Sequence, residues 1–491
     1  MRHPEKKMKH KTTRLKRVFV PLNVIAFVLF ATTASFVSAQ TFTTLHSFTQ
    51  TEDPTAALIQ ATDGSLYGTT FGNPYDNQGG TIFKITPTGT LTGLYSFCGG
   101  DCPDASNPAG ALIQATNGDF YGTTEYGGTG GNGVVFKITP TGEFTNLYNF
   151  CSLFGCADGE NPLAGLVQSV KGDLYGTTYY GGTSGHAGTI FTITPDGTFK
   201  TLYNFCLVNG CPDGENPAAA LIQASNGNFY GTTQSGGANN AGTIFQITPS
   251  GVLTTLHSFC SLGCSGGSLP LTGLVQASNG DLYGTSAGGA NGSGTIYSIT
   301  VSGAFATLYS LCSQTGCPDG SDANEAGLVE GTDGKLYGTT YEGGANNSGT
   351  IFSITTAGAL STHYSFCSQS GCADGSGPYA ALVQDTDGAF FGTTVGGGVE
   401  SGGVVFSLST GLRPFVKTHP ASGTVGTVIK VLGTDLTGAT SVSFNGVAAA
   451  FEVVSSTYIA TTVPAGATSG KVKVVTPGGT LYGNKSFEVL P

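Results

Sequence analysis

The motif LYGTT, or a close variant of it, occurs seven times along the chain, starting at residues 66, 120, 174, 229, 282, 336 and 390. Around each copy the same four runs return in the same order, as ALIQATDG, SLYGTT, GGTIFKITPTG and TLTGLYSF do within residues 57–97. Each run is short, rich in β-branched and aromatic residues, and bounded by Gly, Pro, Asn or Asp, which predicts one strand per run. Four strands in each of seven units predict an all-β fold, and specifically a seven-bladed β-propeller spanning residues 40–412.

The ends of the repeat array favour a closed ring over its alternative, an open β-solenoid. The outer-strand motif occurs as TLHSF at 44–48, before the first LYGTT, and no copy follows the seventh unit, which stops at residue 412. The strand 41–48 is therefore predicted to complete the last blade, which leaves no exposed sheet edge. A solenoid would need capping units, and the sequence contains none that we recognise. The 78 glycines, the absence of tryptophan and the low share of charged residues, 10%, also fit short strands joined by turns.

The repeat unit, (G/A)L(V/I)QA-(D/N)G-xLYGTT-GG-GT(I/V)F-IT-G-LxxLYSF, resembles the extracellular Gloeo-Verruco tandem repeat over residues 41–412. The resemblance implies a bacterial surface or secreted protein that carries a variable anchoring module at one end. It implies neither a substrate nor a catalytic residue.

Residues 1–39 have the features of a secretory signal peptide. Eight Lys or Arg precede an apolar run at 18–36, and the tripeptide Val-Ser-Ala then offers a cleavage site before Gln40. The alternative is an uncleaved membrane anchor, because the apolar run is long enough to span a bilayer. Cleavage lowers the count of Lys and Arg from 19 to 11 and that of Asp and Glu from 30 to 29, so the mature net charge is near −18. With Arg413 as its single arginine, such a chain is a poor partner for nucleic acids.

Residues 413–491 differ from the repeats, because cysteine is absent and alternating runs such as TVIKVLG, SVSFNGV and GKVKVVTPGG predict a small immunoglobulin-like β-sandwich. The stretch from PASGTVGTVIKVLG to KVKVVTPGGT is similar to the IPT/TIG domain over nearly its whole length. In that family the domain serves in surface receptors, as a spacer in polysaccharide-degrading enzymes, and as a DNA-binding module in some transcription factors. The predicted export and the scarcity of arginine argue against DNA binding here.

In a four-stranded antiparallel blade, the two tight turns lie at one end, the tight-turn end, and the two long connections lie at the other, the long-loop face. The long connections contain no Lys or Arg. Their acids are Asp53, Asp104, Glu125, Asp158, Glu160, Asp213, Glu215, Asp319, Asp322, Glu325, Glu342, Asp374 and Glu400. The long-loop face is therefore predicted to carry the function, and to attract Ca²⁺, amines or neutral sugars rather than anions.

All 12 cysteines form closely spaced pairs, each within one long connection. The pairs are Cys98 and Cys102, Cys151 and Cys156, Cys206 and Cys211, Cys260 and Cys264, Cys312 and Cys317, and Cys367 and Cys372. An even number of cysteines in an exported chain predicts disulfides, each of which stabilises the fold by about 2 kcal/mol through closure of a short loop. The alternatives are metal sites and redox pairs. A tetrahedral zinc site would need two further ligands for each pair, and no histidine is near the pairs in the sequence.

Several residues of the long connections are candidates for ligand binding or catalysis. Asp104, Asp158, Asp213, Asp319 and Asp374 follow the cysteine pairs, where Asp before Gly typically caps a turn, and where a ring of carboxylates would alternatively hold Ca²⁺ or sugar hydroxyls. Glu160 and Glu215 are the candidate catalytic pair, because GENP repeats in adjacent blades and glycoside hydrolysis uses two carboxyl groups. Tyr126, Tyr180 and Tyr341, close after YGTT, are candidates for stacking on sugar rings.

One position of the innermost strand is occupied by glutamine in six units and by glutamate in the sixth unit. These residues are Gln60, Gln114, Gln168, Gln223, Gln276, Glu330 and Gln384. A polar residue repeated at one buried position predicts hydrogen bonds between blades.

We therefore expect a non-catalytic binding or adhesion protein of the cell surface or its surroundings, whose partners are neutral glycans or surface proteins. No cofactor is predicted, with Ca²⁺ as the one ion that the acids favour. The first alternative is an extracellular carbohydrate-active enzyme, a glycoside hydrolase or lyase, that uses acids of the long-loop face. The second is an architectural coat or matrix protein.

Overall fold

The computed structural model describes residue 1 and residues 40–72, 78–98, 105–183, 186–260, 264–323 and 326–490. The predicted signal peptide, Cys102 with its pairing to Cys98, Asp104 and Glu325 lie outside these ranges. The described residues form 38 strands and two single turns of 3-10 helix, η1 (Phe154–Cys156) and η2 (Ser370–Cys372). The expected all-β class is confirmed. Within the described ranges, no helix is both long and apolar enough to cross a bilayer.

The repeats fold into seven antiparallel sheets, numbered here 1 to 7, in the described part of the chain. Sheet 1 contains β3 (Ile59–Gln60), β4 (Leu66–Gly72), β5 (Gln78–Ile85) and β6 (Leu91–Cys98), with the short β2 (Glu52–Asp53) also paired to β4. Sheet 2 contains β7 (Ile113–Gln114), β8 (Phe120–Thr124), β9 (Val134–Ile138) and β10 (Phe144–Asn149). Sheet 3 contains β11 (Val167–Gln168), β12 (Leu174–Thr178), β13 (Thr189–Ile193) and β14 (Phe199–Asn204).

The remaining repeats continue the same order of strands. Sheet 4 contains β15 (Ile222–Gln223), β16 (Phe229–Thr233), β17 (Thr243–Ile247) and β18 (Leu253–Ser258). Sheet 5 contains β19 (Val275–Gln276), β20 (Leu282–Ser286), β21 (Thr295–Ile299) and β22 (Phe305–Ser310). Sheet 6 contains β23 (Val329–Glu330), β24 (Leu336–Thr340), β25 (Thr350–Ile354) and β26 (Leu360–Ser365). Sheet 7 contains β27 (Val383–Gln384), β28 (Phe390–Thr394), β29 (Ser401–Ser409) and β1 (Thr41–Thr49).

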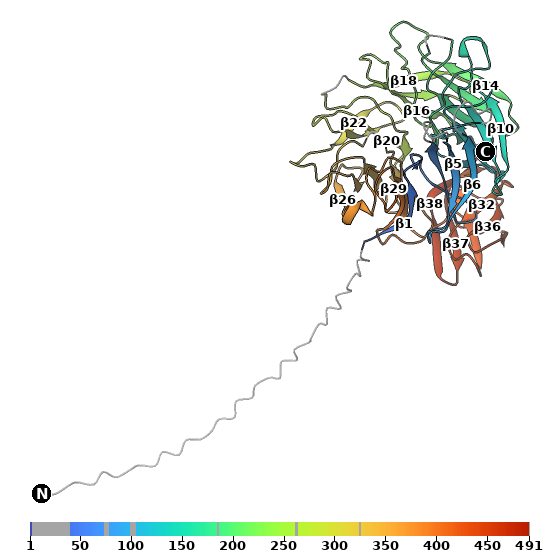
Figure 1. Cartoon of the computed structure of the whole chain (residues 1–491). Helices are drawn as coiled ribbons and strands as arrows, with labels where there is room; N and C mark the ends of the chain where they lie inside the picture. Colours follow the sequence, from blue (N-terminus) through green and yellow to red (C-terminus); the bar gives the residue numbers. More distant parts are fainter. Residues whose placement is uncertain are drawn as a thin grey trace. The chain divides into compact units, whose positions relative to one another are not determined.

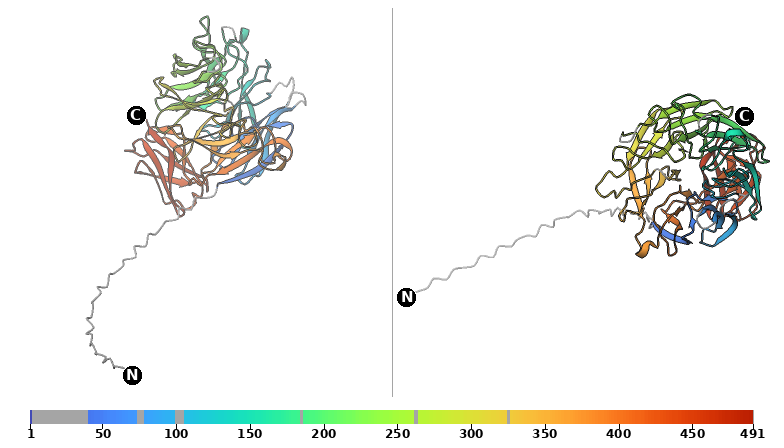
Figure 2. Two further views of the ribbon diagram at one scale, coloured as in Figure 1. Left: turned by 90° about the vertical axis from the view of Figure 1, so that its left-hand side faces the viewer. Right: turned by 45° about the horizontal axis from the view of Figure 1, so that its top comes forward.

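Sheet 7 combines strands from opposite ends of the repeat region. β1 pairs antiparallel with β29, from Thr41 opposite Ser409 to Thr49 opposite Ser401. In the right-hand view of Figure 2, the coloured sheets follow one another around a common centre, and the blue N-terminal strand lies beside the orange strands. The first strand of the array therefore supplies the outer strand of the last sheet.

The YGTT motif has a packing reason at each position. The Leu or Phe before it is fully buried, and the tyrosine fills the space between neighbouring sheets. A Cβ on Gly68 would lie 2.6 Å from Leu58 Cδ2 and 2.7 Å from Phe83 Cζ, so only glycine fits under these two side chains. The first threonine links neighbouring sheets, as when Thr123 Oγ1 donates to the carbonyl of Ala164 at 2.8 Å. The motif recurs because each sheet must meet the next one in the same way.

The glutamines of the inner strands form a closed ring of hydrogen bonds. Each side-chain oxygen accepts the backbone N–H two residues after the equivalent position of the preceding sheet. The seven links are Gln114 to Thr62, Gln168 to Thr116, Gln223 to Val170, Gln276 to Ser225, Glu330 to Ser278, Gln384 to Thr332, and Gln60 to Thr386, at 2.8–3.2 Å. The last link joins sheet 7 to sheet 1. The predicted hydrogen bonding between repeats is confirmed.

The C-terminal residues form two further sheets, called here the C-terminal domain (Figure 1). One sheet contains β30 (Lys417–His419), β32 (Val428–Leu432), β36 (Tyr458–Thr462) and β35 (Phe451–Val453). The other contains β31 (Ser422–Gly423), β38 (Gly479–Val489), β37 (Gly470–Thr476), β33 (Ser441–Phe444) and β34 (Val447–Ala449).

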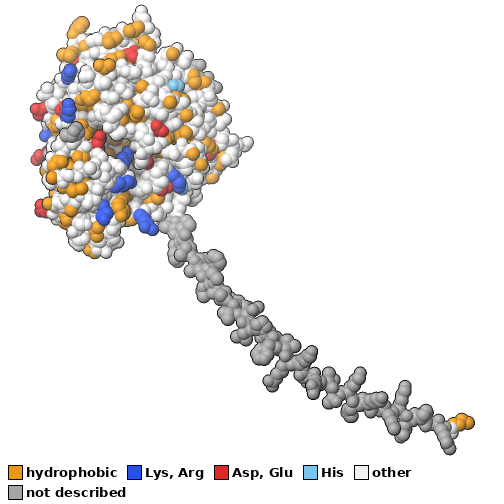
Figure 3. All heavy atoms as spheres, turned by 180° about the vertical axis from the view of Figure 1, so that it is seen from behind, with side chains coloured by type: hydrophobic (Ala, Val, Ile, Leu, Met, Phe, Trp, Pro, Cys, Tyr) orange, Lys and Arg blue, Asp and Glu red, His pale blue; other side chains and the backbone are white. Residues whose placement is uncertain are grey.

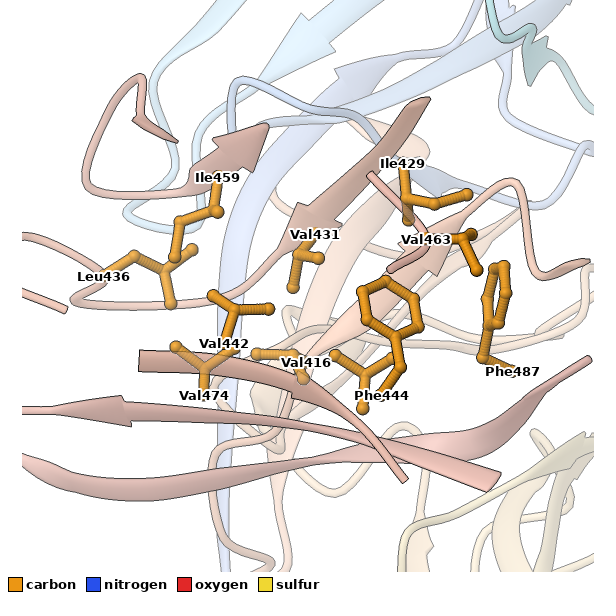
Figure 4. Packing of buried hydrophobic residues seen from close by; sticks show 11 residues of the cluster. Val416, Ile429, Val431, Leu436, Val442, Phe444, Ile459, Val463, Val474 and Phe487 are labelled. Atoms are coloured by element: carbon orange, nitrogen blue, oxygen red, sulfur yellow. The ribbon is translucent and has the colours of Figure 1, made fainter. Parts of the chain in front are cut away.

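A separate apolar core lies between the two C-terminal sheets. Figure 4 shows Val431, Ile459, Phe444 and Phe487 pointing toward one another from opposite sheets. The rings of Phe444 and Phe487 meet edge to face, with centroids 5.0 Å apart. This alternation of inward apolar residues is the pattern expected for a two-layer sandwich.

Candidate functional site

A cavity of about 910 Å³ is lined by residues from all seven sheets. Each repeat has a buried leucine directly before its inner strand, and the residue that precedes this leucine lines the cavity. That residue is alanine or glycine in every repeat. The set is Ala57, Ala111, Gly165, Ala220, Gly273, Gly327 and Ala381. A Cβ on Gly165 would lie 2.6 Å from the carbonyl oxygen of Ala111, so these small residues allow neighbouring inner strands to approach closely. Because they precede the inner strands, they lie toward the long-loop face.

The residue that follows YGTT determines the chemistry of this cavity. The residues at this position that line the cavity are Phe71, Glu125, Tyr179, Gln234, Tyr341 and Val395. Sheet 5 has Ala287 at the same position. The four residues before this position are almost unchanged among the repeats, whereas the position itself differs in nearly every sheet. Six of the seven sheets therefore contribute a side chain from this position to the cavity, and these side chains are of five types.

Two contacts join these side chains to one another and to the wall. The hydroxyl of Tyr179 donates a hydrogen bond to Gln234 Oε1 on the next sheet. The ring of Tyr341 meets Tyr379, which also lines the cavity, nearly at right angles with centroids 6.2 Å apart. The lining therefore offers aromatic faces and amide groups that are already positioned for a ligand.

The cavity has acidic groups and no positive ones among the described residues that line it. Asp53 and Glu125 both contribute carboxyl groups. Burial raises the pKa of Asp53. Burial also raises the pKa of Glu125, and a hydrogen bond from Tyr126 offsets part of that rise. Anionic ligands are disfavoured here, whereas neutral hydroxyl groups find acceptors in the carboxylates and in Gln234.

Of the three tyrosines that were predicted to bind a ligand, one lines the cavity and two lie outside it, because side chains alternate along an extended segment. Tyr341 lines the cavity. Tyr126 and Tyr180 lie one residue further along their own loops, and each is 45% exposed outside the cavity. There their backbones form isolated bridges with Ser106 and Glu160. Sequence reasoning did not single out Phe71, Gln234 or Tyr379, although comparison of the residue after YGTT across the repeats would have identified the first two.

The aspartates that follow the cysteine pairs hold their own loops. Asp158 is fully buried and accepts hydrogen bonds from the Tyr148 hydroxyl at 2.8 Å and the Ser152 and Leu153 N–H groups at 2.9 and 3.1 Å. Equivalent bonds reach Asp319 and Asp374, and Asp213 accepts from Tyr203 and Cys206. None of these four carboxylates lines the cavity. Burial raises the pKa of Asp374, but the hydrogen bonds from Tyr364, Ser368 and Gln369 together lower it by more, so that it lies below its usual value.

Five of the six predicted disulfides are present in the described residues: Cys151–Cys156, Cys206–Cys211, Cys260–Cys264, Cys312–Cys317 and Cys367–Cys372. Their Cα atoms are 4.0–6.2 Å apart. Each bond closes a short loop, and in three of these loops the buried Asp158, Asp319 or Asp374 accepts hydrogen bonds from the loop backbone.

The candidate catalytic glutamates lie beside these disulfides, outside the cavity. Glu160 pairs with His186 Nδ1 at 2.8 Å, so a histidine from another long connection lies beside this glutamate. The backbone bridge between Glu160 and Tyr180 brings the glycine-rich loop with His186 to this place. Glu215 Oε2 lies 3.4 Å from Cys211 Sγ. In both groups the sulfur atoms are bonded to each other, so neither offers the thiolate that a metal would need.

The C-terminal domain contacts the inner strands at the tight-turn end. Lys417 Nζ donates to Gln60 Oε1 at 3.3 Å and to the carbonyl of Gln384. Lys485 Nζ donates to the carbonyl of Gln276 at 3.0 Å. The side chain of Lys417 as a whole is only partly buried, but its ammonium group is enclosed, and burial lowers its pKa to about 8 against the attraction of Asp385. Figure 3 shows that most Lys and Arg side chains of the visible face gather in its lower half.

A second hollow, of about 720 Å³, lies between the C-terminal domain and sheet 6. Its lining includes Arg413, Lys471 and Asp333. Arg413 is exposed, and Lys471 Nζ donates to the carbonyl of Asn484. It contains no cluster of buried polar groups that would select a ligand.

Comparison with known proteins gives one family. The family described as the Gloeobacter/Verrucomicrobia repeat matches residues 28–212, 207–323 and 316–486. No curated protein matches the chain in sequence.

Solved structures with a similar course of the chain include three of low sequence identity. A candidate gluconolactonase is 10% identical, with a TM-score of 0.40, covering 77% of this chain and 94% of its own. The extracellular domain of a candidate hybrid two-component system protein of Bacteroides thetaiotaomicron is 13% identical, with a TM-score of 0.46, covering 92% of this chain and 54% of its own. An auxiliary nutrient binding protein of Bacteroides ovatus is 12% identical, with a TM-score of 0.39, covering 75% of this chain and 76% of its own.

The buried aspartate is predicted to stabilise its loop without taking part in ligand binding. Asp374→Asn removes the charge that four N–H and O–H donors share, and we expect it to lower the free energy of unfolding by about 2 kcal/mol, as measured by urea titration. The matched control is Asp196→Asn, because Asp196 is exposed and bonds only to its neighbours Thr194 and Thr198. Equal stability of the two variants would contradict the assignment.

The enclosed lysine makes stability depend on pH in a defined direction. Its pKa is 10.5 in the unfolded chain and about 8 in the folded one, so between these values only the unfolded chain binds the proton. Stability therefore rises with pH across this window and is independent of this group below it. Urea unfolding at pH 7.5 and 9.5 should show that the wild type gains stability relative to Lys417→Met. A difference that does not change with pH would show that Lys417 keeps its ordinary pKa.

Proposed function

The chain belongs to the family of Gloeobacter/Verrucomicrobia repeat proteins, and we propose that it is an exported binding protein that recognises neutral glycans without transforming them. In this proposal the seven sheets are the blades of a β-propeller, and the C-terminal domain is an immunoglobulin-like sandwich of the IPT/TIG type. Residues 1–39 are a signal peptide that is cleaved near Ala39, and the mature protein works outside the cell or at its surface.

Several features support the export and the architecture. Five disulfides are expected in an oxidising compartment and not in the cytosol. Seven sheets of the same strand order are joined in a ring, with an equivalent inner-strand hydrogen bond between every pair of neighbours. The two C-terminal sheets enclose their own apolar core, as a sandwich domain does.

The observation that carries the proposed function is the lining of the central cavity. Tyr179, Tyr341 and Tyr379 supply aromatic faces, which stack on the apolar faces of sugar rings. Gln234 and the carboxyl groups of Asp53 and Glu125 supply hydrogen-bond partners for hydroxyl groups. The volume of about 910 Å³ falls within the ~300–1,000 Å³ of typical small-molecule sites. Sulfated or uronate-rich glycans are excluded by the acidic lining.

The same carboxyl groups favour one alternative, an extracellular carbohydrate-active enzyme. Burial raises the pKa of Glu125 and of Asp53, as a general acid requires. In that case the catalytic pair would be these two residues and not Glu160 and Glu215, which lie outside the cavity. Release of reducing sugar from a bound oligosaccharide, abolished in Glu125→Gln, would establish the enzyme and overturn the non-catalytic proposal.

Binding to a glycan array, with and without Ca²⁺, tests the proposal. We expect the full mature chain to bind a set of neutral oligosaccharides, and Tyr341→Ala to weaken that binding at least tenfold because a stacking face is lost from the cavity. Gln234→Ala is expected to act in the same direction. Phe154→Ala is the matched control, because Phe154 is a fully exposed aromatic residue of a long loop outside the cavity, and it should bind within twofold of the wild type.

Three outcomes would contradict the proposal. Binding of surface proteins alone would replace the glycan by a protein partner. Self-assembly with no glycan bound would favour an architectural role. Loss of binding in Phe154→Ala, with the Tyr341 variant unaffected, would move the site from the cavity to the outer loops. Dependence on Ca²⁺ would add an ion that the acidic long-loop face attracts.

A further inference from the structure

The C-terminal domain reaches the inner strands of several sheets at once. Lys417 contacts Gln384 of sheet 7 and Gln60 of sheet 1. Thr457 Oγ1 donates to the carbonyl of Thr62 in the first tight turn of sheet 1 at 3.3 Å. The backbone of Ala115, directly after the inner strand of sheet 2, is close enough to His419 to raise its pKa against the effect of burial.

Other contacts lie on the far side of the ring. Lys485 Nζ donates to the carbonyl of Gln276, the last residue of the inner strand of sheet 5. The carboxylate of Glu330, in sheet 6, attracts the same ammonium group. Sheets 2 and 5 are three steps apart in a ring of seven, which is almost opposite. A domain that touches the inner strands of sheets 1, 2, 5, 6 and 7 therefore spans the axis of the ring.

These contacts are made at the tight-turn end, whereas the cavity opens at the long-loop face. The glutamines that Lys417 and Lys485 contact end the inner strands, and the alanines and glycines of the cavity wall precede the same strands. The positive groups bind backbone carbonyls there, so the domain is fixed by directed hydrogen bonds, and not only by apolar contact. The cavity thus has a mouth at one end and the C-terminal domain behind the other.

We infer that the cavity accepts the terminal unit of a glycan chain, an inference that rests on the proposed binding of neutral glycans. The C-terminal domain closes the far end of the cavity and so excludes internal segments of the chain. A polymer that passes through a ring needs two open ends. A cavity with one mouth takes only a chain end, with the rest of the glycan leaving between the disulfide-closed loops. The side chains after YGTT then surround the terminal sugar from several sides, and the units beyond it contact the mouth alone.

Chemical capping of the two ends of one bound oligosaccharide tests this inference for whichever neutral oligosaccharide the full mature chain binds. Three forms are compared by calorimetry: the unmodified oligosaccharide, the same compound reduced with borohydride at its reducing end, and the compound with a 4,6-benzylidene acetal on its non-reducing end. We expect one of the two caps to weaken binding at least tenfold and the other to change it less than twofold. Affinity should stop rising after the first two or three sugar units.

The outcomes separate this inference from the proposed function. If no oligosaccharide binds, glycan binding itself is wrong. If oligosaccharides bind and both capped forms bind within twofold of the unmodified one, the site binds internal sugar units and the inference is overturned. Tyr341→Phe keeps the aromatic ring and its packing, so this variant should fold and should keep the preference for one end of the oligosaccharide. Gln234→Ala should lower the affinity of the unmodified and the tolerated form by the same factor.

Discussion

The ring of inter-sheet hydrogen bonds is the constraint on which the rest of the structure depends. Each inner-strand glutamine, or Glu330, accepts one N–H from the sheet before it, and Gln60 closes the circle with Thr386 across 326 residues of chain. The pairing of β1 with β29 closes the same circle at the outer edge. Because every sheet has a partner on both sides, the seven inner strands are held around one central space. Their small residues let them approach closely enough to form the wall of a single cavity.

This constraint explains why most of the repeated residues are not available for binding. Leucine, tyrosine, glycine and the first threonine of LYGTT are enclosed in the packing within and between the sheets, and the second threonine bonds within its own sheet, as Thr178 does with Thr189. The aspartate after each cysteine pair is enclosed by its own loop, as Asp158 shows with four donors around it. What varies is the residue after YGTT, where the packing of one sheet on the next does not require one residue type. Chemical variety is found at that position, and it faces the cavity.

The features that could be predicted from the sequence are those that repeat. Seven copies of four apolar runs predicted the strands, and six glutamines and one glutamate at one position predicted the contacts between sheets. The offset of TLHSF pointed to β1 as the partner of β29. Repetition makes a local signal visible, because a residue needed for packing must recur in every unit.

The candidate site was only partly predictable, for two physical reasons. Neighbouring residues of an extended segment point to opposite sides, so Tyr341 lines the cavity while Tyr126 and Tyr180, one position later in their repeats, do not. The sequence also does not tell a carboxylate that binds its own loop from one that faces a ligand, as with Asp374 and Glu125. The contacts of Lys417 with Gln60 and of Lys485 with Gln276 join residues 357 and 209 positions apart, and leave no local pattern.

Amide hydrogen exchange in β1 tests the closed ring most directly, because the cavity and its closure by the C-terminal domain both require that ring. In a closed ring the amides of residues 41–49 are released only when sheet 7 opens, so peptides from this segment should exchange as slowly as those from residues 401–409. Exchange of residues 41–49 at the rate of an unstructured peptide, with residues 401–409 still protected, would show an open array and contradict the account.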